Sequence, residues 1–205
     1  MTEAVSVIRN ATEIVVVQRK ELAELFGFET RNKYSIEANG VPFAYAAEQG
    51  KSGVELVLRY FLGHWRTFEI HCFDSTRNLV FRALHPFRFF FQRLDVVLAD
   101  GQVVGAVQQR FALLSKRFDV LDANGAVLLT VSSPFWRPWS FAFERHGDEV
   151  ARIEKKWSGL LKEAFLDADR FRILFHRQDL SLPERLLVLA AAVFVDLRYF
   201  EAKAR

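Results

Sequence analysis

The residues best suited to chemistry at a surface are aromatic side chains and arginines, which gather in two short segments, 84–91 and 134–139. Tryptophan and phenylalanine at loop tips settle at the headgroup level of a bilayer, and neighbouring cations attract anionic lipid. The combination predicts contact with an anionic phospholipid surface. The residues expected to make it are Arg82, Phe87, Arg88, Phe89, Phe90, Phe91, Arg93, Phe135, Trp136, Arg137 and Trp139.

The charge pattern around the first segment favours the same prediction. Between Asp74 and Asp95 the chain has arginines but no acidic residue. Each cation near an anionic surface contributes about 1 kcal/mol, so a few together would give reversible adhesion. The alternative interpretation places these aromatic rings in the protein core. However, the run Phe89–Phe91 cannot point inward throughout, because successive side chains of a strand alternate between its two faces.

No group of residues predicts an enzyme active site. The five histidines lack metal-ligand spacing, and nucleophile-elbow, P-loop and dinucleotide-binding motifs are absent from the sequence. Cys72 is the single cysteine, and neither it nor the pair Ser132 and Ser133 has a recognisable catalytic neighbourhood. A single cysteine also excludes a disulfide framework and a cysteine-based zinc site, and it favours a reducing compartment.

The bulk properties of the 205-residue chain predict one domain, which spans residues 1–205 with a core from about residue 12 to residue 201. The net charge of +3 is compatible with an anionic membrane or with nucleic acid, but it demonstrates neither. The opening Met1–Glu3 lacks the basic-then-apolar pattern of a secretory signal, so we expect a cytoplasmic protein.

The elements that must position the aromatic segments are mostly strands. Residues 13–18 are rich in β-branched side chains, and Asn39–Gly40 is a strong hairpin turn because both residues tolerate positive φ. Further units of strand, tight turn and strand follow at regular spacing. They lie at Phe68–Val80, Leu94–Val104, Phe118–Leu128 and Phe141–Ala151. Regular hairpins of this kind favour a barrel or a sandwich.

One helix is predicted near the end of the chain. Ser181 is a suitable N-cap, Pro183 suits a first turn, and Leu186–Val195 is apolar throughout. A helix that is apolar on every face must lie in a core or in lipid. The apolar run is about half of the roughly 20 residues that span a bilayer. Extending it would insert Asp196 and Arg198 at about 2.5–3.5 kcal/mol each, so burial in protein is favoured over membrane insertion.

These elements can be combined in one fold. A closed antiparallel barrel wrapped around the apolar helix would bury the helix and remove the exposed edges of the sheet. The expected fold is therefore mainly β (α+β). The helix residues expected to be buried are Leu187, Leu189, Ala191 and Phe194.

Several blocks of the chain resemble the phospholipid scramblase family, whose fold is shared with the C-terminal domain of tubby proteins. The blocks are Gly27–Ile36, Pro42–Glu48, Trp157–Gly159 with Glu163–Asp169, and Phe194–Glu201. The resemblance covers about Thr12 to Glu201, and it implies a barrel of twelve strands around the central hydrophobic C-terminal helix. Animal members carry cysteine clusters, some lipidated, where this chain has its two aromatic segments, so palmitoylation at these places is excluded.

The resemblance implies a scramblase-like, peripheral phospholipid-binding domain at the inner, cytoplasmic face of a membrane, with a role in transbilayer phospholipid movement. The alternative is a non-enzymatic binding module of another class. It would be a phosphoinositide- or nucleic-acid-associated regulator, as in tubby-like relatives, or a carrier of an apolar ligand. Nucleic acid is the less favoured partner because a net charge of +3 is modest for that role.

The same resemblance implies a calcium segment that would use Asp167, Asp169 and Asp179. Calcium requires six to eight oxygen ligands, but Gln178 stands at the expected closing position and the glycine for a sharp turn is missing. Arginines lie among the acids, and large apolar residues alternate along 171–175. The sequence therefore favours a strand with ion-paired acids over a Ca²⁺ site.

Overall fold

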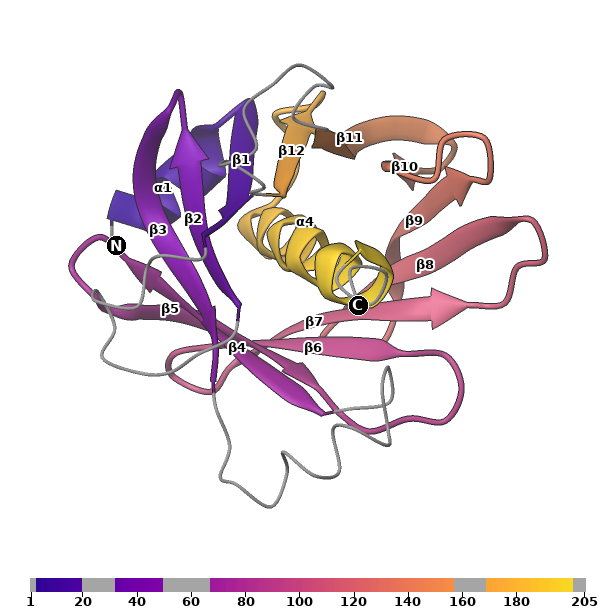
Figure 1. Cartoon of the computed structure of the whole chain (residues 1–205), viewed down its shortest axis with the longest axis horizontal. Helices are drawn as coiled ribbons and strands as arrows, with labels where there is room; N and C mark the ends of the chain where they lie inside the picture. The colour runs from indigo at the N-terminus through magenta and orange to yellow at the C-terminus, as the bar shows by residue number, and fades with distance from the viewer. Residues whose placement is uncertain (1–2, 20–31, 50–66, 157–168, 201–205) are drawn as a thin grey trace.

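The computed structural model describes residues 3–19, 32–49, 67–156 and 169–200, and the strands in these ranges form one closed barrel (Figure 1). The strands are β1 (Glu13–Gln18), β2 (Lys33–Ala38), β3 (Val41–Glu48), β4 (Phe68–Asp74), β5 (Leu79–His85), β6 (Arg93–Leu98), β7 (Val103–Arg110), β8 (Ser115–Asp122), β9 (Val127–Pro134), β10 (Ser140–Arg145), β11 (Asp148–Lys156) and β12 (Arg170–Phe175). The helices are α1 (Glu3–Asn10) and α4 (Leu182–Val195), which continues into a π-helical turn, η2 (Asp196–Phe200).

The twelve strands follow one another around the barrel in chain order, and every neighbouring pair is antiparallel. The barrel closes where β1 pairs with β12, with Ile14 opposite Ile173. Closure pairs both edges of the sheet, which would otherwise expose unpaired N–H and C=O groups. The predicted closed antiparallel barrel is confirmed.

Alternating side chains separate the inside of the barrel from its outside. In β12, Phe171, Ile173 and Phe175 are buried, whereas Arg170 is exposed and Arg172 is half-buried. This period of two is what a strand with one apolar face requires. The strand that the sequence indicated over these residues is therefore confirmed.

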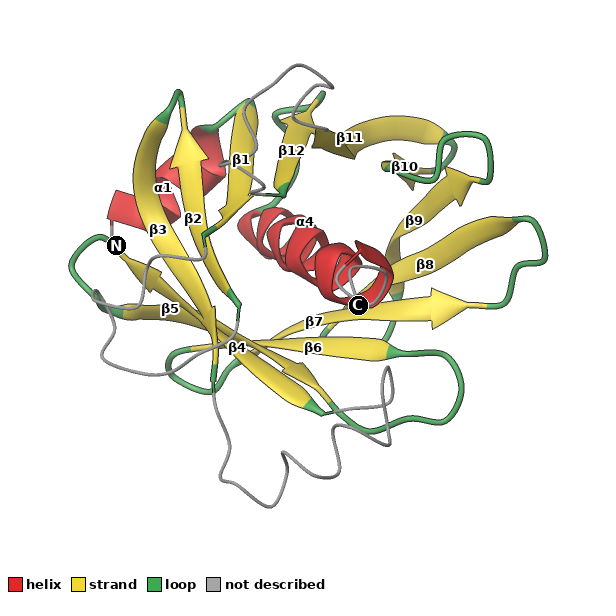
Figure 2. Ribbon diagram, in the orientation of Figure 1, coloured by secondary structure: helices red, strands yellow, loops and turns green. Residues whose placement is uncertain are grey.

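Helix α4 passes through the middle of the barrel and is surrounded by strands (Figure 2). Its N-terminus carries a capping box, in which Ser181 accepts from the backbone N–H of Glu184 and the Glu184 carboxylate accepts from the backbone N–H of Ser181. All of Glu184–Val195 is buried, including the predicted Leu187, Leu189, Ala191 and Phe194. In the described ranges no helix combines the length and the apolarity that crossing a bilayer requires.

Burial of α4 extends beyond its apolar run. Asp196, which ends the run, is also buried, and its carboxylate accepts a hydrogen bond of 2.9 Å from the Tyr34 hydroxyl of β2. The polar residue after the helix is therefore part of the barrel interior and does not mark the return of the chain to water.

Helix α1 was not expected from the sequence. It buries Ala4 and Ile8 against the core, and its last carbonyls are bound by Arg185 of α4. The Arg185 guanidinium is fully buried and donates to the backbone oxygens of Ile8, at 3.2 Å, and Ala11, at 2.7 Å. A cation at a helix C-terminus satisfies carbonyls that have no partner within the helix.

The meander gives the barrel two unlike ends. Because successive strands alternate in direction, successive connections fall at opposite ends. One end holds short polar turns at 39–40, 75–78, 99–102, 123–126 and 146–147. The other end holds the β5–β6, β7–β8 and β9–β10 connections, residues 86–92, 111–114 and 135–139, and it is the end at which α4 finishes.

Candidate lipid-binding site

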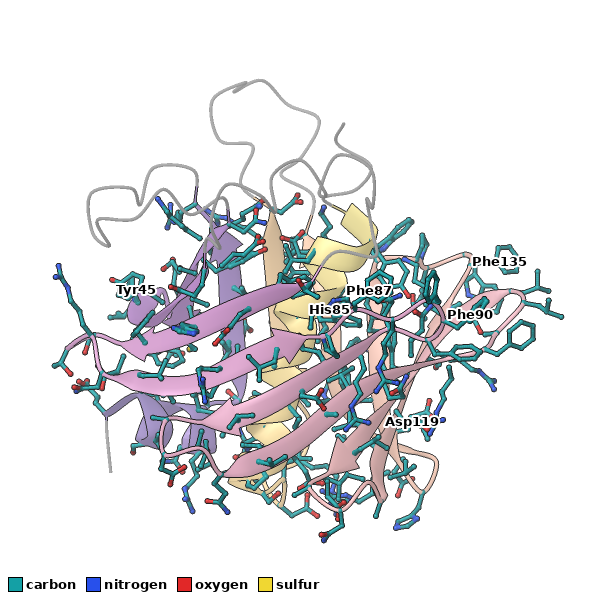
Figure 3. The ribbon with its side chains drawn as sticks, turned by 90° about the horizontal axis from the view of Figure 1, so that it is seen from below. Tyr45, His85, Phe87, Phe90, Asp119 and Phe135 are labelled. Carbon is teal, nitrogen blue, oxygen red and sulfur yellow. The ribbon has the colours of Figure 1, made fainter. Side chains whose placement is uncertain are left out.

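Exposed apolar side chains are concentrated on three loops at one end of the barrel. Strands β5 to β10 are consecutive neighbours, so the three loops lie next to one another along the rim. Figure 3 shows Phe90 and Phe135 at one margin of the molecule, with Phe87 nearer the middle of the same view. The exposed members, which we call the aromatic rim, are Phe87, Phe89, Phe90, Phe91, Phe111, Leu113, Leu114, Phe135, Trp136 and Trp139.

The degree of exposure argues against the core interpretation of these rings. Phe90 is 80% exposed and Trp136 is 65% exposed, whereas core phenylalanines such as Phe141 and Phe171 are completely buried. Isolated apolar residues on a surface are normal, but a contiguous patch of large ones marks a site of interaction.

The β7–β8 loop was missed at the level of sequence. Leu113 is 85% exposed and Leu114 is 74% exposed, and Phe111 begins the same connection. The available signal was an apolar run between two strands, in a position where a polar turn is expected. This run extends the candidate surface from two loops to three.

The rim loops are held by local contacts. Phe87 and Phe89 meet edge to face with ring centroids 5.0 Å apart, and Phe135 and Trp136 meet in the same way at 5.0 Å. The Lys116 ammonium donates to the backbone oxygen of Pro138 at 2.8 Å. Edge-to-face pairs of this kind add about 0.5–1.5 kcal/mol to area burial, so the exposed rings are partly ordered before any partner binds.

The predicted arginines differ in how they are paired. Arg93 contacts Asp95 at 2.6 Å, and Arg82 lies within the barrel wall on β5, 3.8 Å from Glu69. Arg88 and Arg137 are exposed on the rim loops and form no ion pair with any described residue. Of the predicted arginines, Arg88 and Arg137 therefore supply unpaired positive charge on the described rim loops, and Arg82 is not part of the rim.

The predicted calcium ligands are not brought together where the structure describes them. Asp169 precedes β12 and contacts Lys155 at 2.7 Å, whereas Asp179 follows β12 and contacts Arg145 at 3.3 Å and Arg177 at 3.0 Å. A strand of this length spans roughly 20 Å, so one ion cannot bind both carboxylates. Asp167 lies outside the described residues. Within those residues no group of three or more metal-ligating side chains occurs.

The side chains considered for nucleophilic chemistry have structural surroundings. Cys72 is buried in β4, and burial raises the pKa of its thiol far above the ordinary value, so the reactive thiolate is not formed. The Ser133 hydroxyl is buried and donates to the backbone oxygen of Arg137 at 3.2 Å, which supports the β9–β10 loop.

Comparison with known proteins places this geometry in a family. The Scramblase family model matches residues 1–202. The chain belongs to the Scramblase family. Human phospholipid scramblase 2 is 31% identical over 92% of the chain and 67% of its own length. Rat phospholipid scramblase 1 is 32% identical over 92% of the chain and 60% of its own length.

The chain is also similar to a fungal protein. Altered inheritance rate of mitochondria protein 25 from Saccharomyces cerevisiae is 24% identical over 97% of the chain and 73% of its own length. No solved structure matches the chain. The tubby-like barrel expected for a scramblase agrees with the twelve strands observed, and the alternative of an unrelated binding module is not favoured.

Proposed function

We propose that this Scramblase family member binds the surface of anionic phospholipid membranes through the aromatic rim, as a peripheral domain on the cytoplasmic face, and that it takes part in phospholipid movement. The observation that carries the proposal is the gathering of ten large exposed apolar side chains, among the described residues, on three adjacent loops of one barrel end. Arg88 and Arg137 add unpaired positive charge to the same loops.

The energies of such a contact are sufficient for reversible binding. Removing about 100 Å² of each inserted ring from water gives roughly 2.5 kcal/mol. Each arginine near an anionic surface adds about 1 kcal/mol. Two or three inserted rings with two arginines would therefore hold the domain on a membrane without a spanning segment.

The barrel interior is not available to lipid. Helix α4 fills it, and the side chains that face the strands, such as Leu187 and Phe194, are buried. Lipid contact is therefore assigned to the outside of the barrel, at the rim. The opposite end has short polar turns, so the domain would sit on a membrane with these turns facing the cytoplasm.

The rim can be tested by removing two rings from separate loops. We expect Phe89→Ser combined with Trp136→Ser to weaken binding to vesicles of phosphatidylcholine and phosphatidylserine by more than about 100-fold, because each ring contributes over 1.4 kcal/mol. Vesicle flotation measures this affinity.

The matched control is Val41→Ser combined with Val127→Ser, which removes two exposed apolar side chains from the turn end. The control should bind as the unmodified protein does. Equal affinity of the rim variant and the control would contradict the proposal.

A further inference from the structure

Behind the tips of the aromatic rim, the outer wall of the barrel contains a cleft of about 560 Å³. The β5–β6 loop forms one side and β7 forms the other. Its walls include Arg88, Arg93 and Arg110, the side chain of Gln109, and the rings of Phe90 and Phe111. Figure 3 shows Phe90 on this side of the barrel, above the wall that carries Asp119. A volume of this size falls in the range of about 300–1,000 Å³ that small-molecule sites occupy.

The charged groups that line the cleft are all hydrogen-bond donors. Arg93 contacts Asp95 through Nε at 2.6 Å, and Arg110 contacts Asp119 through Nε at 2.5 Å. These contacts orient both guanidinium groups, whereas their terminal Nη groups form no hydrogen bond to another described residue. The described lining contains no carboxylate. Guanidinium groups with free Nη donors suit the tetrahedral oxygens of a phosphate.

The loop over the cleft is held in an unusual conformation. Phe91 has a φ of +50°, in the left-handed region that a bulky residue rarely adopts. The buried Gln108 side chain donates to the Phe91 backbone oxygen at 2.8 Å, and the Gln92 side chain donates to the Arg88 backbone oxygen at 2.8 Å. Such strain persists where surrounding contacts impose it, and it is concentrated at ligand sites.

A second hydrogen bond ties the loop to the neighbouring strand. The Gln92 backbone N–H donates to Gln109 Oε1 at 3.2 Å, so the amide nitrogen of Gln109 remains available as a donor in the cleft. The glutamines therefore fix the loop that presents Arg88 and Phe90. Arginines and rings are arranged before a ligand arrives, which reduces the ordering cost of binding.

We propose that this cleft binds the phosphate of an anionic phospholipid headgroup, whose acyl chains lie along Phe90 and Phe111 toward the rim. The inference rests on the proposed function and adds a defined headgroup site to it. Adhesion by the rim alone needs only a negative surface, whereas this site contacts one lipid molecule through Arg88, Arg93 and Arg110.

The first test measures how charge removal from the cleft affects vesicle binding. We expect Arg110→Gln to weaken binding to vesicles of phosphatidylcholine and phosphatidylserine in equal parts by about fivefold, and Arg93→Gln with Arg110→Gln by about 25-fold. Binding to pure phosphatidylcholine vesicles should not change. Arg77→Gln, which removes the same charge from a turn at the opposite end, is the control.

The second test uses no membrane. Nuclear magnetic resonance titration with glycerophosphoserine should shift the side-chain signals of Arg93, Gln109 and Arg110, and Arg88→Gln with Arg110→Gln should abolish these shifts. Inorganic phosphate should shift them less. Equal shifts with inorganic phosphate would assign the cleft to free phosphate and overturn the lipid assignment.

The two tests separate the inference from the proposed function. If the rim variant loses vesicle binding but Arg93→Gln with Arg110→Gln behaves as Arg77→Gln does, the headgroup site is wrong and the rim proposal stands. If the unmodified protein binds no vesicles, the proposed function fails, and the glycerophosphoserine titration then decides whether the cleft binds a phosphodiester. An absence of shifts in that titration would overturn the proposal that the cleft binds a headgroup phosphate.

Discussion

At the scale of single residues, the most consequential side chain of the interior is Arg185. Its guanidinium is completely buried, lies 4.3 Å from the centre of the Phe175 ring and donates to Gln178 Oε1 at 3.1 Å as well as to two carbonyls near the end of α1. Burial lowers the pKa of this guanidinium below its ordinary value. Neutral oxygens and an aromatic face therefore stabilise this charge, and no carboxylate among the described residues pairs with it.

This arrangement predicts a specific cost for a conservative substitution. Arg185→Lys keeps the charge, but one ammonium group cannot reach the carbonyls of Ile8 and Ala11 together with Gln178. We expect the free energy of unfolding to fall by about 2 kcal/mol, because buried hydrogen-bonding groups are left unpaired. Urea denaturation measures the change.

Arg9→Lys on the exposed face of α1 is the matched control and should change stability by less than about 0.5 kcal/mol. If Arg185→Lys lowered the free energy of unfolding no more than this control does, the hydrogen bonds from Arg185 to the end of α1 would not contribute to stability.

At the scale of elements, the packing of α4 depends on one glycine of β7. Gly105 has a φ of +152°, and a Cβ atom there would lie 2.1 Å from the backbone oxygen of Leu121 and 3.1 Å from Leu187 Cδ1. The missing side chain lets β7, β8 and the central helix approach one another closely. No flexible group can move away, because the nearest atom belongs to the backbone of the neighbouring strand.

We therefore expect Gly105→Ala to destabilise the fold by more than about 3 kcal/mol, through both the overlap with Leu121 and the backbone conformation. Gly125→Ala is the comparison, since Gly125 also has positive φ, at +85°, but has open space around it. We expect Gly125→Ala to lower the free energy of unfolding by about 1 kcal/mol. Urea denaturation of the two variants distinguishes steric overlap from backbone strain, and equal losses would show that the close approach of Gly105 to Leu121 and Leu187 is unimportant.

At the scale of the whole molecule, the connections that the structure describes are polar at one end of the barrel and aromatic at the other. In a meander of antiparallel strands, alternate connections lie at the same end of the barrel. Connections of one residue type that alternate along the chain are therefore collected at one end. The short turns carry asparagine, aspartate and glycine, and the opposite connections carry rings and leucines. Among the described residues, the fold therefore gathers its large exposed rings and leucines at one end.

Orientation on the membrane is testable with fluorophores. Cys72 is buried, so an environment-sensitive dye attached to an introduced cysteine reports its own position. Vesicles containing phosphatidylserine should shift the emission of a label at Leu113→Cys to shorter wavelength, because that loop enters the headgroup layer. A label at Ala123→Cys in a polar turn should show no change. Equal shifts at both positions, or a shift at residue 123 alone, would contradict the orientation.

The sequence by itself determined the strands, the turns and α4, because those signals are local. A period of two, turn residues such as Asn39 and Gly40, and the capped apolar run after Ser181 each act over a few residues. The family resemblance supplied the number of strands. Only tertiary structure decided which distant residues meet. The tertiary structure brings the end of the short helix α1 to Arg185 and places Phe111–Leu114 beside the two expected loops. It also separates Asp169 and Asp179, which lie at opposite ends of β12. Barrel closure and strand direction fix these relations, and neither is a property of any short segment.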